Sequence, residues 1–273
     1  MNAKSIAKSS PGKIVQTLRG YEAYVPGKLP RHIALRDAKL IRLLAEAERS
    51  LGRLSGIGYL VPNTDFLVIP YTRLEAVASS RIEGTQASLS ELFYFEAVDE
   101  TPRITDDVKE VTSYLAALYY GLELLKELPI SLRLIRKVHK ALMSGMRGGS
   151  PDKTPGEFRR TQNWIGGYAL KDAEYVPPPQ ENLKELLDDF EKFLHEDKPT
   201  MPLLVECALM HYQFEGIHPF LDGNGRVGRL LITLLLCARD VLPQPLLYLS
   251  YFFEQNRRVR FCGCSTTYSQ NPI

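Results

Sequence analysis

The feature that most constrains this chain is the stretch from His218 to Arg229, which reads His-Pro-Phe-Leu-Asp-Gly-Asn-Gly-Arg-Val-Gly-Arg. Apolar residues recur at helical spacing from within this stretch onward: Val227, Leu230, Leu231, Leu234 and Leu235. That pattern predicts a buried helix that begins near Asn224. The chain is therefore expected to place a polar, glycine-rich turn at the start of a buried helix.

The chemistry of the same stretch favours phosphate binding. Glycines let backbone N–H groups approach a phosphate closely, and the dipole of a helix N-terminus adds positive potential there. Arg226 and Arg229 are three residues apart, so both guanidinium groups project from one side of the first turn. The stretch predicts a polyphosphate site with His218 at its mouth. The alternative, a capped helix start with surface arginines, explains neither the histidine nor both arginines.

The composition is that of an ordinary globular protein. The 273 residues are 44% hydrophobic and 24% charged, with a formal net charge of +2, which gives no case for a nucleic-acid or membrane surface. The longest apolar run, from Leu230 to Ala238 apart from Thr233, is too short to span a bilayer. Four cysteines make no disulfide framework, and residues 1–12 contain no apolar segment, so we expect a cytoplasmic protein.

Helical periodicity recurs along most of the chain, and about eight helices and one hairpin are expected, which is an all-α architecture. The apolar stripes before the signature lie at residues 37–51, 74–82, 108–122, 134–142, 183–194 and 203–214. We expect residues 52–58 to break the first helix and residues 63–71 to form an irregular connection. Thr72 followed by Glu75 then predicts a capping box with Thr72 as N-cap.

The stretch from His218 to Arg229 matches His-Pro-Phe-x-Asp-Gly-Asn-Gly-Arg-x-x-Arg, the active-site signature of the Fic family, at every fixed position. The chain therefore resembles this family over roughly residues 35–258. The resemblance implies a Fic helical core with a short β-hairpin flap and an N-terminal helical subdomain. The expected division is an extended arm at 1–34, an N-terminal helical domain with an inhibitory helix at 35–106, a catalytic core at 107–258 and an atypical tail at 259–273.

The tail departs from the family pattern. Relatives of this kind carry a Tyr-Tyr pair, a further helix and a domain resembling a winged helix, whereas Arg260 and Phe261 stand at the tyrosine positions here. The composition shifts abruptly to Cys, Ser and Thr after Arg258, which suggests an altered reading frame near residue 259. Because the second tyrosine of the pair contacts the nucleotide in the family, we expect weakened nucleotide affinity.

The fragment from Ser79 to Gly84 resembles the inhibitory motif of the family, Ser/Thr-x-x-x-Glu-Gly/Asn. Ser79 and Glu83 are four residues apart and therefore lie together on a helix. In the family this glutamate pairs with the second arginine of the signature, here Arg229, and misaligns the triphosphate of ATP. The alternative is an ordinary solvated helix face, on which Ser and Glu at this spacing are common.

Residues 156–179, hereafter the flap segment, contain two short β-prone stretches separated by a polar turn, which predicts a small hairpin. In Fic proteins the corresponding Gly-x-x-Arg…Ile-Gly-Gly…Val-Pro-Pro-Pro segment is the flap, which pairs with the backbone of the target and shields the nucleotide. The resemblance places Asn163, Trp164, Ile165 and Gly166 at the nucleotide. An ordinary surface hairpin is the alternative.

The resemblance implies an ATP-dependent nucleotidyltransferase, a protein adenylyltransferase (AMPylase) that transfers AMP to a Ser, Thr or Tyr hydroxyl of a target protein or of itself. His218 would be the general base and Asp222 the Mg²⁺ ligand. The expected nucleotide-binding set is Glu83, Asn163, Trp164, Ile165, Gly166, His218, Asp222, Gly223, Asn224, Gly225, Arg226 and Arg229, with Ser79 and Glu83 inhibitory. Removal of AMP from a modified target, and nucleotide binding without turnover, remain alternatives, and the target protein and the oligomeric state stay open.

The remaining histidines and cysteines are expected to have no role in the chemistry. His139, His195 and His211 fall on predicted helices and are expected to be ordinary histidines without specific partners. Cys207 and Cys237 lie among apolar residues and are expected to be buried and inert.

Overall fold

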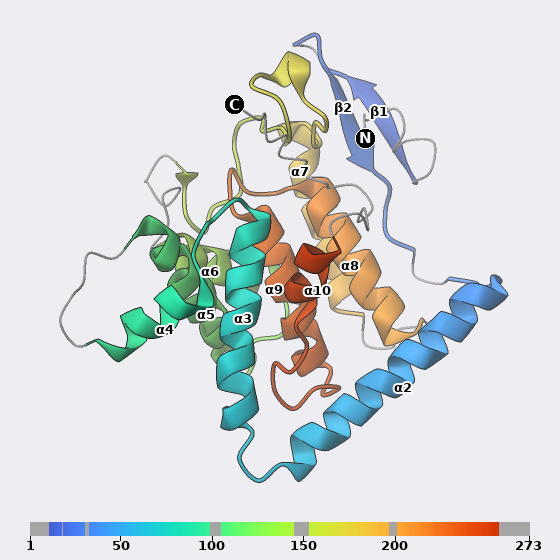
Figure 1. Cartoon of the computed structure of the whole chain (residues 1–273). Helices are drawn as coiled ribbons and strands as arrows, with labels where there is room; N and C mark the ends of the chain where they lie inside the picture. Colours follow the sequence, from blue (N-terminus) through green and yellow to red (C-terminus); the bar gives the residue numbers. More distant parts are fainter. Residues whose placement is uncertain are drawn as a thin grey trace.

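A buried helix and its neighbours organise the described part of the chain, which contains nine α-helices and one two-stranded sheet (Figure 1). The elements are β1 (Gly12–Gln16), β2 (Glu22–Pro26), α2 (Ala38–Leu60), α3 (Asp65–Ile82), α4 (Leu89–Ala97), α5 (Asp106–Leu124), α6 (Leu132–Met143), η2 (Leu170–Asp172), α7 (Gln180–Leu194), α8 (Leu203–Ile217), α9 (Asn224–Ala238) and α10 (Leu249–Gln255). The structure, a computed structural model, describes residues 11–17, 19–30, 33–98, 105–144, 153–196 and 201–256. The tail at 259–273 and most of the arm before residue 11 lie outside these residues, as do parts of the expected linker and loop at 99–104 and 145–152.

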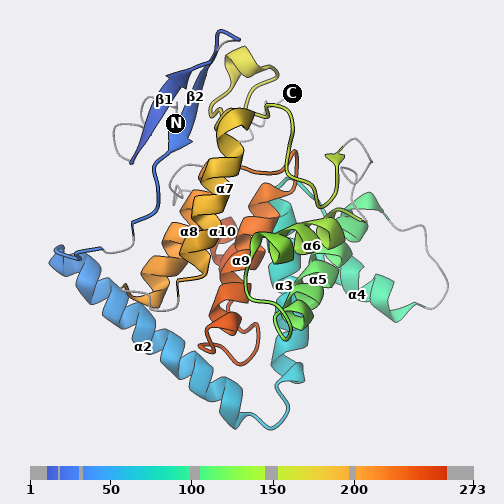
Figure 2. The same cartoon turned by 180° about the vertical axis from the view of Figure 1, so that it is seen from behind.

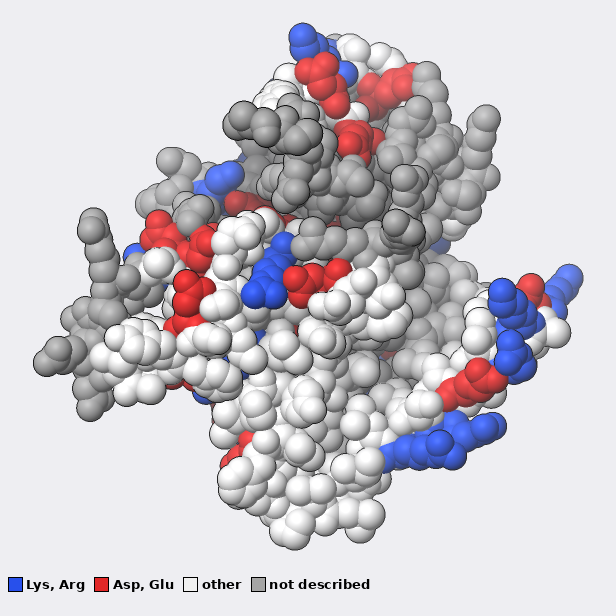
Figure 3. All heavy atoms as spheres, in the orientation of Figure 1, with Lys and Arg blue, Asp and Glu red and all other residues white. Residues whose placement is uncertain are grey.

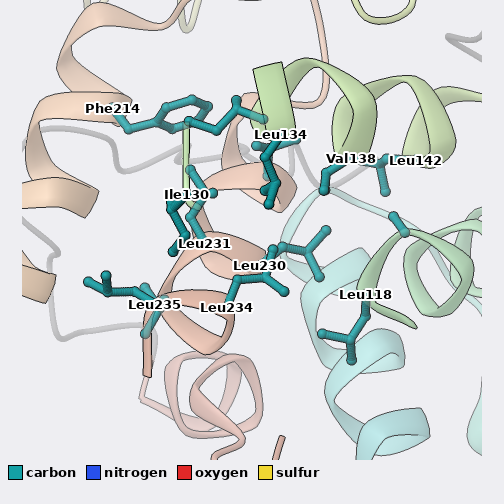
Figure 4. Packing of buried hydrophobic residues seen from close by; sticks show 14 of the residues in the cluster. Leu118, Ile130, Leu134, Val138, Leu142, Phe214, Leu230, Leu231, Leu234 and Leu235 are labelled. Atoms are coloured by element: carbon teal, nitrogen blue, oxygen red, sulfur yellow. The ribbon is translucent and has the colours of Figure 1, made fainter. Parts of the chain in front are cut away.

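Helix α9 lies at the centre of the fold, as the apolar stripe after the signature predicts. Its residues are buried on nearly every side, and a helix that is apolar all round is stable only when other elements surround it. Leu230 and Leu234 of α9 pack in one cluster with Leu118 of α5, Val138 of α6 and Phe214 of α8 (Figure 4). The turn that precedes α9 is therefore attached directly to the core.

Helix α3 crosses the molecule between α5 and α10 and also contacts α9. Figures 1 and 2 show α3 beside α9 and α10 from both sides. The last residues of α3 lie close to the first turn of α9, because Ser79 hydrogen-bonds Arg229. This packing brings the inhibitory motif, about 140 residues upstream of the signature, to the glycine-rich turn.

The prediction of a break at residues 52–58 is wrong, because α2 is continuous from Ala38 to Leu60. Glycine lowers helix stability by about 1 kcal/mol relative to alanine but does not by itself end a helix. A Cβ on Gly58 would lie 2.8 Å from side-chain atoms of Pro243 and Leu246. The glycine at 58 thus allows α2 to approach the loop after α9, instead of interrupting the helix.

The predicted start of α3 at Thr72 is also wrong. The helix begins at Asp65 and continues through Pro70, and the residues expected to be irregular belong to it. The Thr72 hydroxyl donates to the carbonyl oxygen of Val68, 2.7 Å away, in the manner of a threonine inside a helix. Glu75 does not return to cap Thr72 but binds the backbone N–H of Ser250, 2.9 Å away, so a tertiary contact replaces the expected capping box.

The arm is more ordered than an extended segment. β1 and β2 form an antiparallel hairpin, and Tyr24 is buried against Tyr175 of the flap segment. The Tyr24 N–H donates to the carbonyl oxygen of Val176 over 2.9 Å, so β2 runs beside the flap segment, as both views show. The expected flap hairpin consists of a single β-bridge between Ile165 and Tyr175, with the short helix η2 between them.

The described surface is unevenly charged. Figure 3 shows that charged side chains are sparse over the lower part of the face drawn there, where α3 begins. Large apolar side chains are exposed at the end of α2 and the start of α3: Ile57, Tyr59, Leu60, Phe66 and Leu67. Among the described helices, none is both long and apolar enough to cross a membrane.

Candidate active site

His218 ends α8 in a left-handed conformation, with φ 50° and ψ 61°. A residue with a side chain rarely adopts this conformation, which costs about 1 kcal/mol or more and persists only where surrounding contacts hold it. The left-handed turn directs the chain away from α8 into residues 217–223, hereafter the base loop. His218 has 16% of its side chain exposed, and its Nδ1 lies 3.8 Å from Oε2 of Glu215.

The flap segment supplies the contacts that hold the base loop. The Arg159 guanidinium donates from Nε to the carbonyl oxygen of His218 over 3.0 Å and from Nη2 to that of Pro178 over 2.6 Å. Asn163 donates from Nδ2 to the carbonyl oxygen of Phe220 over 2.7 Å. Consequently Asn163, expected at the nucleotide, holds the loop that carries His218.

The surroundings of His218 keep its imidazole neutral. Burial and the positive charge of Arg159 lower the pKa of His218 to about 4, although the Glu215 backbone and the carboxylates of Glu83 and Asp222 act in the opposite direction. A neutral imidazole is the form that accepts a proton. His218 is therefore in the basic form throughout the physiological pH range.

The start of α9 offers backbone N–H groups to a ligand. Gly223 is the N-cap with φ 76°, a conformation that favours glycine, and it turns the chain into the helix. The Asn224 side chain accepts from the Phe220 N–H and donates to the Phe220 carbonyl oxygen, both at 2.9 Å, so it braces the base loop. A Cβ on Gly225 would clash with Oε1 of Glu83, so this glycine allows Glu83 to reach the helix start.

Arg229 is bound to the end of α3. Its Nη2 donates to Oε1 of Glu83 over 2.7 Å, and its Nε donates to Oγ of Ser79 over 2.8 Å. Burial alone would raise the pKa of Glu83, but the charges of Arg229 and Arg226 outweigh it and lower the pKa. Glu83 is therefore an ionised carboxylate paired with Arg229, the second arginine of the signature.

Arg226 is bound to a carboxylate that the sequence did not indicate. Its Nη1 donates to Oε2 of Glu110 on α5 over 3.2 Å, and Thr85 donates to the same oxygen over 2.8 Å. The Nη2 atom of Arg226 lies 3.7 Å from Oδ1 of Asp222. Both arginines of the signature thus face carboxylates, Arg229 through the inhibitory motif and Arg226 through α5.

Asp222 has the position and the exposure that a metal ligand needs. Its side chain is 37% exposed, its Oδ1 accepts from the Gly223 N–H over 2.6 Å, and its Oδ2 lies 3.9 Å from Nζ of Lys153. The described residues contain no group of three or more His, Cys, Asp or Glu side chains arranged for a metal. Mg²⁺ commonly takes one or two carboxylates together with phosphate oxygens and water, so the single carboxylate fits that ion.

The remaining flap residues surround the bridge in the flap segment. Ile165 pairs with Tyr175, and the Trp164 side chain is 41% exposed. Gly166 lies so close to Glu174 that a Cβ would come within 2.7 Å of its side chain. The structure therefore brings Asn163 to the base loop and leaves Trp164 facing solvent.

His139 was expected to be an ordinary histidine, and this expectation is wrong. The Gly156 N–H donates to its Nδ1 over 2.8 Å, so Nε2 carries the proton and donates to the Asp222 carbonyl oxygen over 3.1 Å. The ring also stacks on Phe220 with centroids 3.7 Å apart. His139 therefore holds the base loop from α6, and no local pattern in the sequence indicated this contact.

Two other histidines also have partners. His195 Nε2 lies 2.9 Å from the carbonyl oxygen of Ile130, and His211 is hydrogen-bonded to the backbone of Gly228. Cys207 is buried and Cys237 is partly buried, and burial raises the pKa of both thiols, as expected of inert cysteines.

Three side chains that contact the residues of the signature were not among the predicted site residues. Glu215 precedes His218 by three residues on α8, a spacing that places both on one helix face and could have indicated the contact. Arg159 is the arginine of the Gly-x-x-Arg part of the flap segment, but the motif does not indicate what this side chain contacts. No sequence pattern indicated Glu110, because only the packing of α5 against α9 brings it to Arg226.

Comparison with known proteins identifies the family. The model of the Fic/DOC family N-terminal region matches residues 41–123, and the model of the Fic/DOC family matches residues 129–236. Protein adenylyltransferase Fic from Drosophila grimshawi is 34% identical over 170 residues, which cover 59% of this chain and 32% of the relative. The chain thus spans about a third of the length of the curated relatives it matches.

Solved structures have the same fold. A Fic family protein from Desulfovibrio desulfuricans G20 superposes with a TM-score of 0.66 at 23% identity, over 83% of this chain and 65% of that protein. A Fic domain containing signaling protein from Bacteroides thetaiotaomicron superposes with a TM-score of 0.61 at 20% identity, over 80% of this chain and 78% of the other. Because the two family models together match most of its residues, the chain belongs to the Fic/DOC family.

Proposed function

We propose that the chain is a protein adenylyltransferase that transfers AMP from ATP to a hydroxyl group of a target protein, and that Glu83 inhibits this activity. One observation carries the proposal: a neutral histidine lies beside a helix N-terminus whose two arginines are buried together with carboxylates. Such a site suits a triphosphate and a proton acceptor at once. The name of the curated relatives, protein adenylyltransferase, supports the same reaction.

The reaction needs one bond to form and one to break at the α-phosphorus. The target hydroxyl oxygen attacks this phosphorus, its proton passes to the neutral imidazole of His218, and the bond to pyrophosphate breaks. The backbone N–H groups of Asn224 and Gly225, at the start of α9, stabilise the negative charge that develops on the phosphate oxygens. Arg226 and Arg229 hold the β- and γ-phosphates, which fixes the attacked phosphorus in line with the hydroxyl.

Mg²⁺ fits the proposal through Asp222, whose carboxylate is partly exposed at the start of α9. When bound, the ion would neutralise charge on the phosphate oxygens. The role of Asp222 in this chain is to present one carboxylate oxygen, while its second oxygen accepts from the Gly223 N–H and fixes the loop.

Inhibition follows from the position of Glu83. An ionised carboxylate 2.7 Å from Nη2 of Arg229 occupies the place of a γ-phosphate oxygen and repels it. ATP then binds with its triphosphate displaced from the in-line arrangement. Replacing Glu83 with glycine removes the carboxylate and leaves Arg229 free to bind the phosphate.

The test is the mass of the protein and of lysate proteins after incubation with ATP and Mg²⁺. The Glu83→Gly variant is expected to gain AMP on itself or to label a target from α-labelled ATP, whereas the wild type incorporates far less. Adding His218→Ala to this variant should abolish incorporation while ATP still binds, because only the proton acceptor is lost. Binding of ATP without any AMP gain in Glu83→Gly would indicate a nucleotide-binding module without turnover and would refute the proposal.

A further inference from the structure

Arg159 is a fully buried arginine, 2% exposed, outside the signature. Its guanidinium donates to the carbonyl oxygens of His218, Thr161, Pro178 and Ile217 at 3.0, 3.3, 2.6 and 3.5 Å. The Arg159 N–H also donates to the Pro219 carbonyl oxygen over 2.9 Å. One residue of the flap segment thus binds three consecutive carbonyl groups, 217 to 219, on both sides of the left-handed His218.

The partners of this guanidinium in the described part of the chain are carbonyl oxygens and not carboxylates. Leaving a charge buried among neutral groups is costly, so a structural role alone would be served as well by a neutral donor. Burial lowers the pKa of Arg159 to about 10, and the group is still cationic at neutral pH. A positive charge is therefore maintained against the backbone of His218.

We propose that Arg159 is a positioning residue for the transfer reaction, which holds the proton-accepting His218 in its left-handed conformation and places a positive charge against its backbone. This inference rests on the proposed function, since the role of His218 as base belongs to it. Arg159 acts through His218 and does not contact the start of α9, where the phosphates would bind.

Several charged groups face His218, and Arg159 differs from the others in sign. The carboxylates of Glu83 at the end of α3 and Asp222 in the base loop favour the protonated imidazole. The carboxyl group of Glu215 on α8 lies beside the imidazole. Arg159 opposes them from the flap segment. Without Arg159, burial would still lower the pKa of His218, but the effect of the carboxylates would be less opposed, so the imidazole would hold its proton more strongly than in the parent.

The flap segment gains a second role from this arrangement. The guanidinium ties Pro178 at the end of the flap segment to His218 in the base loop. A displacement of the flap segment therefore displaces the base, and a misplacement of about 1 Å costs roughly 10²-fold in rate.

The experiment uses the full chain carrying Glu83→Gly, with Arg159→Gln, Arg159→Lys and the matched control Arg160→Gln. Arg160 is the exposed next residue, so its variant makes the same charge change without touching the base loop. AMP incorporation from α-labelled ATP is measured between pH 4 and 8. In parallel, the titration of His218 is followed by NMR of histidine-labelled protein, with the resonance assigned by its absence in His218→Ala.

For Arg159→Gln we expect the pKa of His218 to rise from about 4 toward its ordinary value of ~6.5, and the acid limb of the rate profile to move to higher pH with it. The rate at neutral pH should fall roughly 10²-fold, with the KM for ATP within about twofold of the parent. Arg159→Lys keeps the charge, so His218 should titrate as in the parent while the rate falls, because lysine cannot reach all the carbonyl groups.

An unshifted His218 titration in Arg159→Gln, or full activity in Arg159→Lys, would overturn the inference. If Arg159→Gln does not fold, the rate of AMP incorporation by Arg159→Lys tests the inference: a reduced rate supports it, and full activity overturns it. A parent that incorporates no AMP refutes the proposed function instead, and the NMR titration still reports whether Arg159 controls His218.

Discussion

Glu215 is a buried carboxyl group inside the active site but outside the signature. It lies 3.8 Å from the imidazole of His218 and is 7% exposed. Burial raises the pKa of Glu215 to about 7, and the Glu83 charge adds to this effect, while Arg229 opposes it. Since Glu83 already neutralises Arg229, a second carboxylate beside the same arginine gains little by ionising.

This raised pKa predicts a pH dependence of stability. The folded pKa of about 7 lies above the ordinary value of 4.5, so the folded state binds the proton more tightly than the unfolded state. The stabilisation is fully present below pH 4.5 and is lost as the pH rises through 7, with an upper bound of about 3 kcal/mol. We expect the wild type to lose stability between pH 5 and 8 relative to Glu215→Gln, which does not titrate.

Urea unfolding of both proteins at a series of pH values measures the difference. Only the difference between the two curves is informative, because other groups titrate in both proteins. Parallel curves would mean that Glu215 is ionised in the fold at pH 5 and would contradict the prediction.

At the scale of elements, α3 carries a stripe of polar side chains one turn apart, Glu75, Ser79 and Glu83. Ser79 and Glu83 bind Arg229, whereas Glu75 accepts from the N–H groups of Ser250 and Tyr251 in the first turn of α10, at 2.9 and 3.4 Å. The end of α3 that binds Arg229 is therefore fixed to the rest of the molecule partly through α10.

Replacing Glu75 with alanine should loosen this attachment. The buried N–H and hydroxyl groups of Ser250 lose their acceptor, which costs about 1–3 kcal/mol, and the free energy of unfolding should fall accordingly. AMP incorporation should rise above the wild-type level, because α3 then holds Glu83 against Arg229 less firmly. Thermal unfolding and label incorporation measure the two effects.

Glu123→Ala is the matched control, because Glu123 at the end of α5 is 69% exposed and its ion pair is with the equally exposed Lys126 just after the helix. An exposed pair of this kind contributes little, so neither stability nor incorporation should change. If Glu75→Ala were less stable but as inactive as the wild type, α10 would support α3 without taking part in its inhibitory contact.

The elements differ in how much the sequence reveals. Helices α5 to α9 were predicted because their apolar residues recur at helical spacing, and the signature contained its own turn, histidine and arginines. The start of α3 was missed because Pro70 and Thr72 are local signs of a helix start, whereas the helix is stabilised by partners far away, such as Ser250. Arg159 and Glu110 were missed for the same reason, since their partners are distant in the chain.

At the scale of the molecule, the active site draws on three segments that are distant in sequence: the end of α3, the flap segment and the base loop with α9. The two regions expected as separate N-terminal and catalytic domains share a single cluster of buried side chains. This cluster includes Leu92 of α4 and Val77 of α3 together with Leu230 and Leu234 of α9. The contact between Glu83 and Arg229 lies on the boundary between these regions, so this contact depends on their remaining packed together.

A shared core predicts that the two regions unfold in one cooperative transition. Leu92→Ala and Leu234→Ala each remove a fully buried side chain, one from each region, and should each cost about 2–5 kcal/mol. Unfolding of each variant should be followed by the fluorescence of Trp164 in the flap segment and by far-ultraviolet circular dichroism. Both signals should give the same midpoint, and it should be lower than that of the wild type. Leu60→Ala, which truncates a side chain that is 82% exposed, should leave both midpoints unchanged. A Leu92→Ala variant that moves only part of the circular dichroism transition, with Trp164 unaffected, would show two independent units, and the Glu83–Arg229 contact would then have to hold two separate domains together.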